Sequence, residues 1–243
     1  MKSLFRNLAV LAGALLGAAF LTAAPAAAAE GEAHEPEPHD WSWEGIFGTF
    51  DRQELQRGFQ VYQEVCAACH ALEQMSFRNL GEGDGPFTCF PDPNAHDDDG
   101  HHADPLCYDN PNDNPVVRQI AAGYIIEDGP DDFGDMFFRP ATAADAFPSP
   151  FPNQEAARAA NGGAYPPDLS LIVKARSGGA EYIRSLLLGY GEAPADVTVR
   201  PGLYYNEYFP GGLIAMPPQL SEGIVTYADG TEATPERARP CVS

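Results

Sequence analysis

The sequence predicts a mainly α-helical domain with long irregular loops and little β-structure. Apolar residues recur at helical spacing in several short stretches, whereas the sustained alternation typical of strands is not found. The chain holds 24 glycines and 23 prolines among 243 residues, which limits the length of any regular element. Because 44% of the residues are hydrophobic, the chain carries enough apolar surface to fold into a core.

The charge balance restricts the classes of partner. Fourteen lysine and arginine residues stand against 35 aspartate and glutamate residues, for a formal net charge of −21. A chain this acidic repels nucleic acid and anionic membrane surfaces, and it attracts cationic proteins. We therefore expect no nucleic-acid partner.

The first 29 residues are typical of a secretory signal. Lys2 and Arg6 precede an apolar run over residues 8–21, and Ala27-Ala28-Ala29 fits a small-residue cleavage site. The alternative is an uncut N-terminal anchor, since residues 8–29 just reach the length that spans a bilayer. We expect cleavage, and therefore an exported chain in an oxidising compartment. A polar lead-in over residues 30–44 then precedes one domain over residues 45–235.

The first helix is expected to start at Asp51. Aspartate is a favoured N-cap residue, and Glu54 follows at capping-box spacing. Leu55, Phe59 and Tyr62 continue at helical spacing towards a pair of cysteines.

Residues 82–115 are expected to form an acidic insertion without regular structure. The segment contains nine acidic residues, several prolines and no lysine or arginine. It also holds Cys89 and Cys107, which we expect to form a disulfide because two free thiols are unfavourable after export. The histidines and aspartates of residues 96–102 leave a divalent-metal site as a weaker alternative, and Cys241 has no assigned role.

Short helices are expected in the second half of the chain. Asn153 is a candidate N-cap for a helix to residue 160, which Gly162-Gly163 would end. Pro166-Pro167-Asp168 is expected to open a helix over residues 168–176. Another is expected over residues 180–188, and turns with several aromatic residues follow it.

Cys66-Ala-Ala-Cys69-His70 indicates a haem site. On a helix these side chains fall at i, i+3 and i+4, so all three lie on one face. Two thiols at this spacing can form thioethers to one haem, and the adjacent histidine can then bind the iron. A thioredoxin-like pair would follow a strand, a zinc site would need a second ligand pair, and a disulfide within the turn would be strained. We therefore expect a c-type cytochrome-like domain with one covalently bound haem c.

A methionine is the expected sixth ligand of the iron. Met75 lies close to His70 in sequence, on the side that His70 already occupies. Met216 is favoured over Met136 because glycines precede it and two prolines follow it, which gives a loop that can approach the haem. His/Met ligation leaves no open position on the iron, so it favours electron transfer over an open-iron enzyme such as a peroxidase.

Beyond the haem motif, the sequence resembles the cytochrome c1 family, the haem subunits of quinol–cytochrome c reductase, the cytochrome bc1 complex. The matching stretches span nearly all of residues 45–235. They include Gly134–Pro140, Ala156–Ala164, Pro166–Ser170, Lys174–Arg176, Tyr208–Gly212, Ala215–Pro217 and Tyr227–Thr231.

The resemblance implies specific roles for residues of this chain. It implies covalent haem attachment at Cys66 and Cys69, with His70 and Met216 as the iron ligands. By the same match Arg176 and Tyr182 would contact a haem propionate, and Asn161 and Pro167 would line the pocket.

It also implies a function at the periplasmic face of a bacterial inner membrane. The chain would take one electron from a Rieske iron–sulfur protein and pass it to a soluble cytochrome c. Cytochrome b would be a further partner in this respiratory or photosynthetic complex, and the chain would have no catalytic site of its own. The alternative is a free periplasmic electron shuttle.

Two further expectations concern the acidic residues and the C-terminus. The insertion and an acidic cluster are candidates for steering a cationic cytochrome c, and the equal alternative is a solvated surface that only keeps the chain soluble. The members of the cluster are Glu127, Asp128, Asp131, Asp132 and Asp135. The membrane helix that ends family members is not matched by residues 236–243, so membrane association is expected through the complex.

Overall fold

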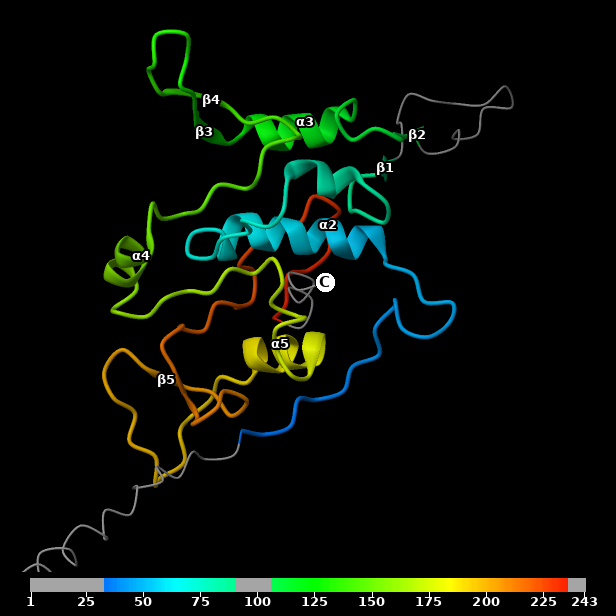
Figure 1. The fold of residues 1–243 in the computed structure, drawn as a ribbon. Coiled ribbons are helices and arrows are strands. Elements are labelled where there is room, and N and C mark those ends of the chain that lie inside the picture. The colour runs from blue at the N-terminus through cyan, green and yellow to red at the C-terminus, as the bar shows by residue number, and fades with distance from the viewer. Residues whose placement is uncertain (1–32, 91–105, 236–243) are drawn as a thin grey trace, which may run out of the picture. The chain divides into compact units, whose positions relative to one another are not determined.

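The computed structural model describes residues 33–90 and 106–235 (Figure 1). The expected signal at residues 1–29, the His/Asp stretch at 96–102 and the tail with Cys241 lie outside these ranges. Within them, every helix falls short of the length and apolar character needed to span a bilayer.

Short helices and three pairs of short strands make up the regular structure of the described residues. The helices are α2 (Arg52–Val61), a π-helical turn (Tyr62–Cys66), a 3-10 helix (Phe77–Gly81), α3 (Pro115–Ala122), α4 (Gln154–Ala160) and α5 (Gly179–Leu188). The antiparallel strand pairs are β1 (Cys89–Phe90) with β2 (Leu106–Cys107), β3 (Ile125–Asp128) with β4 (Phe137–Pro140), and β5 (Tyr204–Tyr205) with β6 (Leu213–Ile214). The mainly helical fold with little β-structure is thereby confirmed.

Helix α2 begins where the sequence predicts. The Asp51 carboxylate accepts hydrogen bonds from the backbone N–H groups of Gln53 and Glu54, which satisfies donors that a helix N-terminus leaves free. Past Val61 the chain continues as a π-helical turn, in which the Ala67 N–H bonds to the Tyr62 carbonyl. One extra residue per turn shifts the face that the following residues present, and such turns are frequent at functional sites.

Two apolar clusters contact this continuous helical segment. Tyr62 belongs to the larger cluster, whose other buried members are Phe77, Leu80, Val117, Ala121, Ala141, Ala143 and Phe147. Val61 belongs to the second, with Val225, Tyr227 and Ala233. Cys66 packs against the larger cluster, so the segment that carries the cysteine motif is fixed to the core.

Several boundaries differ from the sequence predictions. Residues 168–176 form turns and not the expected helix. Helix α3 begins directly after the acidic insertion and was not predicted; Asn114 caps it, and Pro115 occupies its first turn. Within the insertion, the predicted disulfide between Cys89 and Cys107 is confirmed, with an S–S distance of 2.04 Å, and it joins paired residues of β1 and β2.

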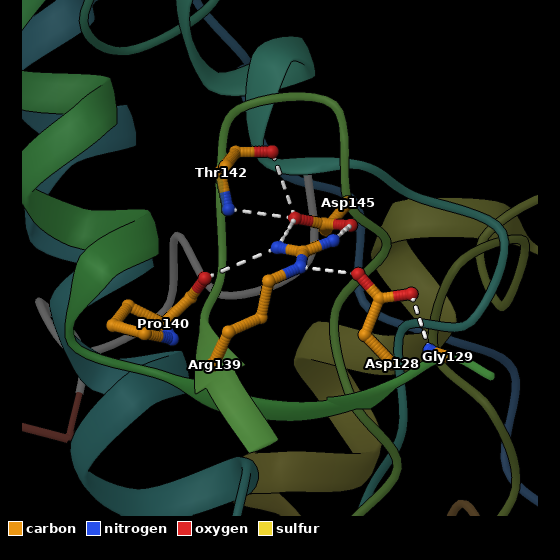
Figure 2. A network of polar contacts seen from close by, with 6 residues as sticks. All are labelled: Asp128, Gly129, Arg139, Pro140, Thr142 and Asp145. Carbon is orange, nitrogen blue, oxygen red and sulfur yellow. Dashed lines mark hydrogen bonds and ion pairs between the residues drawn. The ribbon is translucent and has the colours of Figure 1, made fainter. Parts of the chain in front are cut away.

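Arg139 on β4 is the centre of a polar network (Figure 2). Its guanidinium binds both carboxylate oxygens of Asp145, at 2.8 and 2.9 Å, and also bonds to the Asp128 carboxylate on β3. The backbone and hydroxyl groups of Thr142 donate to Asp145 at 2.7 and 2.8 Å. A planar guanidinium matches a carboxylate in this two-pronged way, which makes the contact both strong and directional.

The network connects the β3–β4 hairpin to the segment after the cysteine motif. The backbone carbonyl of Asp145 accepts from Phe77 N–H, and that of Ala143 accepts from Arg78 N–H. The Phe147 N–H donates to the Met75 carbonyl. Phe77 and Phe147 pack against each other in the core with tilted rings, whose centroids are 4.2 Å apart. The hairpin is therefore fixed to the main body by polar and apolar contacts together.

Asp145→Asn should lower the melting temperature at pH 7 by about 3 °C, a shift of the size that loss of one charge-assisted hydrogen bond produces in a chain of this length. Bonds from Arg139 and Thr142 hold the pKa of Asp145 well below its usual range. The ionised Asp145 therefore contributes stability above its unfolded pKa of about 4, and that contribution is lost as the pH falls through its lower folded pKa.

Thermal unfolding monitored by circular dichroism at several pH values between about 2 and 7 measures this effect. The difference between wild type and Asp145→Asn should be largest at neutral pH and should shrink in acid. Asp132→Asn, on the exposed hairpin turn, is the matched control and should melt as wild type. A deficit in Asp145→Asn that is independent of pH would contradict the ionic explanation.

Candidate functional site

The cysteine motif forms one compact turn at the end of the π-helical segment. The Cys66 carbonyl accepts from the Cys69 N–H at 3.1 Å and from the His70 N–H at 2.9 Å. Cys66, Cys69 and His70 are all half-buried. The backbone therefore carries the three side chains on a single turn, as the i, i+3, i+4 spacing requires.

Neither Cys66 nor Cys69 forms a disulfide in the part of the chain that the structure describes. The disulfide in the described ranges joins Cys89 and Cys107, so the two types of cysteine are used differently. Two thiols three residues apart on one turn are the groups that thioether attachment of a haem needs.

A backbone carbonyl orients the His70 ring. The Nδ1 atom of His70 lies 2.8 Å from the carbonyl oxygen of Pro167. Since a carbonyl only accepts hydrogen bonds, Nδ1 carries the proton, and Nε2 keeps its lone pair. A ligand histidine held through its other ring nitrogen has a fixed tautomer and direction, and histidines at metal centres are usually held in this way.

Residues 167–170 are hydrogen-bonded along residues 70–74, and we call this the 70–74/167–170 contact. Besides the His70–Pro167 bond, Leu169 N–H donates to the Ala71 carbonyl at 2.9 Å. The Asp168 carboxylate accepts from Glu73 N–H at 2.7 Å, and the Ser170 hydroxyl accepts from Gln74 N–H at 3.1 Å. The sequence indicates no such role for Asp168 and Ser170, and it predicts that Asp168, with the two prolines before it, opens a helix.

Burial also keeps His70 neutral. Desolvation lowers its pKa below the usual value, and this effect exceeds the opposing ones of the Pro167 carbonyl and of Asp168. Neutral imidazole is the form that binds a metal ion. The site thus combines an available Nε2, two adjacent thiols and an apolar setting.

Met216 lies on the loop that follows the β5–β6 hairpin. Gly211 and Gly212 in the turn of this hairpin have φ angles of 79° and 72°, a region that favours glycine. The Tyr190 hydroxyl donates to the Met216 carbonyl at 2.9 Å. Burial raises the pKa of Tyr190, so the hydroxyl stays protonated and remains a donor.

The other two methionines of the described residues are placed differently. Met136 lies in the β3–β4 hairpin and is 55% exposed, and its sulfur lies close to the backbone of Gly129 in the same hairpin. Met75 packs against the larger apolar cluster. Met216 as the sulfur ligand stays a prediction.

The remaining predicted site residues fall into two groups. Arg176 is exposed, and its charge acts on the pKa of the half-buried Tyr182 hydroxyl, which burial raises. The two side chains therefore lie within electrostatic range of each other, and their contact with one propionate stays a prediction. Asn161 instead caps the end of α4, where its side chain donates to the Ala157 carbonyl at 2.7 Å.

Not all of the acidic cluster is available for steering. Asp128 is bonded to Arg139, and Asp131 accepts from the backbone N–H groups of Phe133 and Asp135 within the hairpin turn. Both interactions hold the pKa of these carboxyls below its usual range. Glu127, Asp132 and Asp135 are exposed. Around them lie exposed apolar side chains, among them Phe133 at 91% and Phe138 at 74%.

A cavity of about 490 Å³ lies beside the Met216 loop. Leu187 and Leu188 at the end of α5, Tyr190, and Tyr204 and Tyr205 of β5 contribute to its lining, together with Pro218 and Leu220 beyond Met216. The loop that bears the methionine therefore borders open space on the side of these residues.

A helical core around a Cys-x-x-Cys-His turn, with the histidine fixed through Nδ1, defines the architecture of c-type cytochromes. Comparison with known proteins specifies the group further. The Cytochrome C1 family profile matches residues 41–242, and the chain belongs to the cytochrome c1 family.

Relatives in bacteria and plants are similar over most of the chain. Cytochrome c1 of Rhodospirillum rubrum is 43% identical over 214 residues, which cover 82% of this chain and 69% of the relative. The mitochondrial heme protein cytochrome c1-2 of Solanum tuberosum is 44% identical over 196 residues, covering 81% and 65%. Cytochrome b/c1 of Bradyrhizobium diazoefficiens is 45% identical over 237 residues, covering 90% of this chain and 31% of the relative.

Proposed function

We propose that this chain is a one-electron carrier with a single covalently bound haem c in a cytochrome bc1 complex. The observation that carries the proposal is the His70–Pro167 bond, which leaves Nε2 of a neutral histidine available on the same turn as two cysteines that form no disulfide within the described residues. Membership in the cytochrome c1 family and the names of the relatives, which include "heme protein" and "cytochrome b/c1", agree with it.

The residues present fit this group. Cys66 and Cys69 would hold the haem covalently, His70 and Met216 would bind the iron, and Arg176 with Tyr182 would face a propionate. Asn161 and Pro167 would belong to the pocket wall, Pro167 through the carbonyl that orients His70. When bound with these two ligands, the haem supplies a reversible one-electron couple of raised reduction potential.

The proposed partners follow from the family and from the charge. The chain would accept an electron from a Rieske iron–sulfur protein, assemble with cytochrome b, and reduce a soluble cytochrome c at the periplasmic face of the membrane. Exposed carboxylates such as Glu127, Asp132 and Asp135 would attract a cationic acceptor, and brief docking suits repeated electron transfer.

Reduction of a basic cytochrome c by the reduced protein should be strongly salt-dependent. Raising the ionic strength from about 0.01 to 0.15 M shortens the Debye length from about 30 to 8 Å, so the second-order rate constant should fall about tenfold. Stopped-flow absorbance measures the rate constant directly. An acidic cytochrome c is the control, and its rate should rise with salt. A rate for the basic acceptor that does not depend on salt would contradict steering.

Co-purification tests the proposed assembly. The full chain, expressed with an affinity tag in a bacterium that makes a bc1 complex, is isolated from detergent-solubilised membranes. Cytochrome b and a Rieske protein should accompany it in equal amounts, and quinol should reduce its haem. A haem-loaded chain recovered without those subunits, in the soluble fraction, would favour the free shuttle.

A further inference from the structure

The segment that carries Met216 is fixed to the end of α5 by hydrogen bonds of one buried polar residue, Asn206. Asn206 is fully buried, at 0% exposure. Its side-chain amide donates to the Leu186 carbonyl in the last turn of α5 at 2.7 Å, and its carbonyl oxygen accepts from the Tyr208 N–H at 3.1 Å. Its own N–H donates to the Gly212 carbonyl at 2.9 Å, across the β5–β6 hairpin.

Asn206 also connects this segment to Tyr190. The backbone of Tyr190 pairs with that of Asn206 in an isolated β-bridge, and the Tyr190 hydroxyl then donates to the Met216 carbonyl. The fit between α5 and this loop is close, because a Cβ placed on Gly189 would lie 2.3 Å from the Tyr208 ring. Backbone and side chain of Tyr190 thus connect both ends of the hairpin to one helix end.

We propose that Tyr190 and Asn206 are positioning residues that hold the Met216 loop in its iron-binding arrangement. This inference rests on the proposed function, in which Met216 is the sulfur ligand. Pro218 and Leu220, which follow Met216, line the cavity beside the loop, so this part of the chain has space to shift. Without the Tyr190 bond, the arrangement in which the sulfur has left the iron should therefore be more populated.

The test is Tyr190→Phe in the haem-loaded full chain, which removes one hydroxyl and no ring atoms. Carbon monoxide binds ferrous iron only where the methionine has left, so its apparent affinity reports the fraction of that arrangement. Loss of one hydrogen bond should raise this fraction, and with it the apparent affinity for carbon monoxide, about fivefold. The Met–Fe charge-transfer band in the far red should weaken in parallel.

Tyr204→Phe is the matched control. It removes a hydroxyl from the lining of the same cavity, and its carbon monoxide affinity should equal that of wild type. A Tyr190→Phe protein that matches Tyr204→Phe in affinity and spectrum overturns the proposal. If Tyr190→Phe yields too little holoprotein, Asn206→Ser replaces it in the test. This variant removes the bonds to Leu186 and Tyr208, and its carbon monoxide affinity and Met–Fe band are measured in the same way.

A double variant separates positioning from a general structural effect. If Tyr190 acts through Met216, the change that Tyr190→Phe causes in the reduction potential should vanish in a Met216→Lys background. A change that persists there overturns the proposal. Failure of the proposed function is distinct, because wild type itself would then lack the Met–Fe band and would bind carbon monoxide freely.

Discussion

Serine at both Cys66 and Cys69 should yield a polypeptide that carries no covalent haem. Under the proposed function the thiols of Cys66 and Cys69 are the attachment groups, and the Cys89–Cys107 disulfide leaves no thiol at those two other positions. Denaturing electrophoresis with a haem stain should give no signal for the double variant. Intact-mass analysis should show the loss of one haem relative to wild type.

Ala68→Ser is the control for this experiment. It introduces serine at an exposed position in the same turn and keeps the spacing of both cysteines, so the haem should remain attached. Each single cysteine variant should keep at most one thioether. Haem that survives acidic organic extraction from the double variant would exclude the motif as the attachment site.

Met216→Lys should lower the reduction potential by an amount on the order of 0.2 V, because a thioether ligand favours ferrous iron more than an amine does. The Met–Fe band should disappear at the same time. Spectroelectrochemical titration of the purified holoprotein measures both. The haem stain should be unchanged, since attachment depends on other residues.

Met136→Lys is the matched control and also tests the rival ligand. Met136 lies exposed in the β3–β4 hairpin, so the potential and the spectrum should stay those of wild type. If Met136→Lys lowered the potential and Met216→Lys did not, the ligand assignment would be reversed.

Local signals in the sequence predicted the helix starts well. Asp51 and Asn153 cap α2 and α4, because a side-chain oxygen placed just before a helical pattern satisfies free N–H groups wherever the chain goes next. Asn114-Pro115 carries an equally good start signal for α3. It was overlooked because the acidic, proline-rich stretch before it indicated a loop that extended to residue 115.

Asp168 shows where such local reasoning is insufficient. After Pro167 it reads as a helix cap, yet its carboxylate accepts from Ser170 N–H and from Glu73 N–H, 95 positions away. The distant partner holds residues 168–176 in turns. Spacing alone cannot indicate a partner this far along the chain, and the same applies to the bond between Tyr190 and Met216.

The candidate site divides in the same way. The proposed attachment cysteines and His70 belong to a motif of five residues in which all three share one turn, so the local sequence is enough to select them as candidates. The carbonyl that orients His70 has no side-chain signature, and the resemblance placed Pro167 only in the pocket wall. The π-helical turn before Cys66 was likewise not expected, because a period of 3.6 residues does not predict an extra residue in the turn.

The 70–74/167–170 contact joins two parts of the chain that are made at different times. The carbonyl that directs the imidazole ring of His70 lies 97 positions after it, so synthesis from the N-terminus yields the cysteine motif well before Pro167. Under the proposed function, attachment of a porphyrin would need only the earlier segment, whereas a directed His70 would need the later segment to have folded against it.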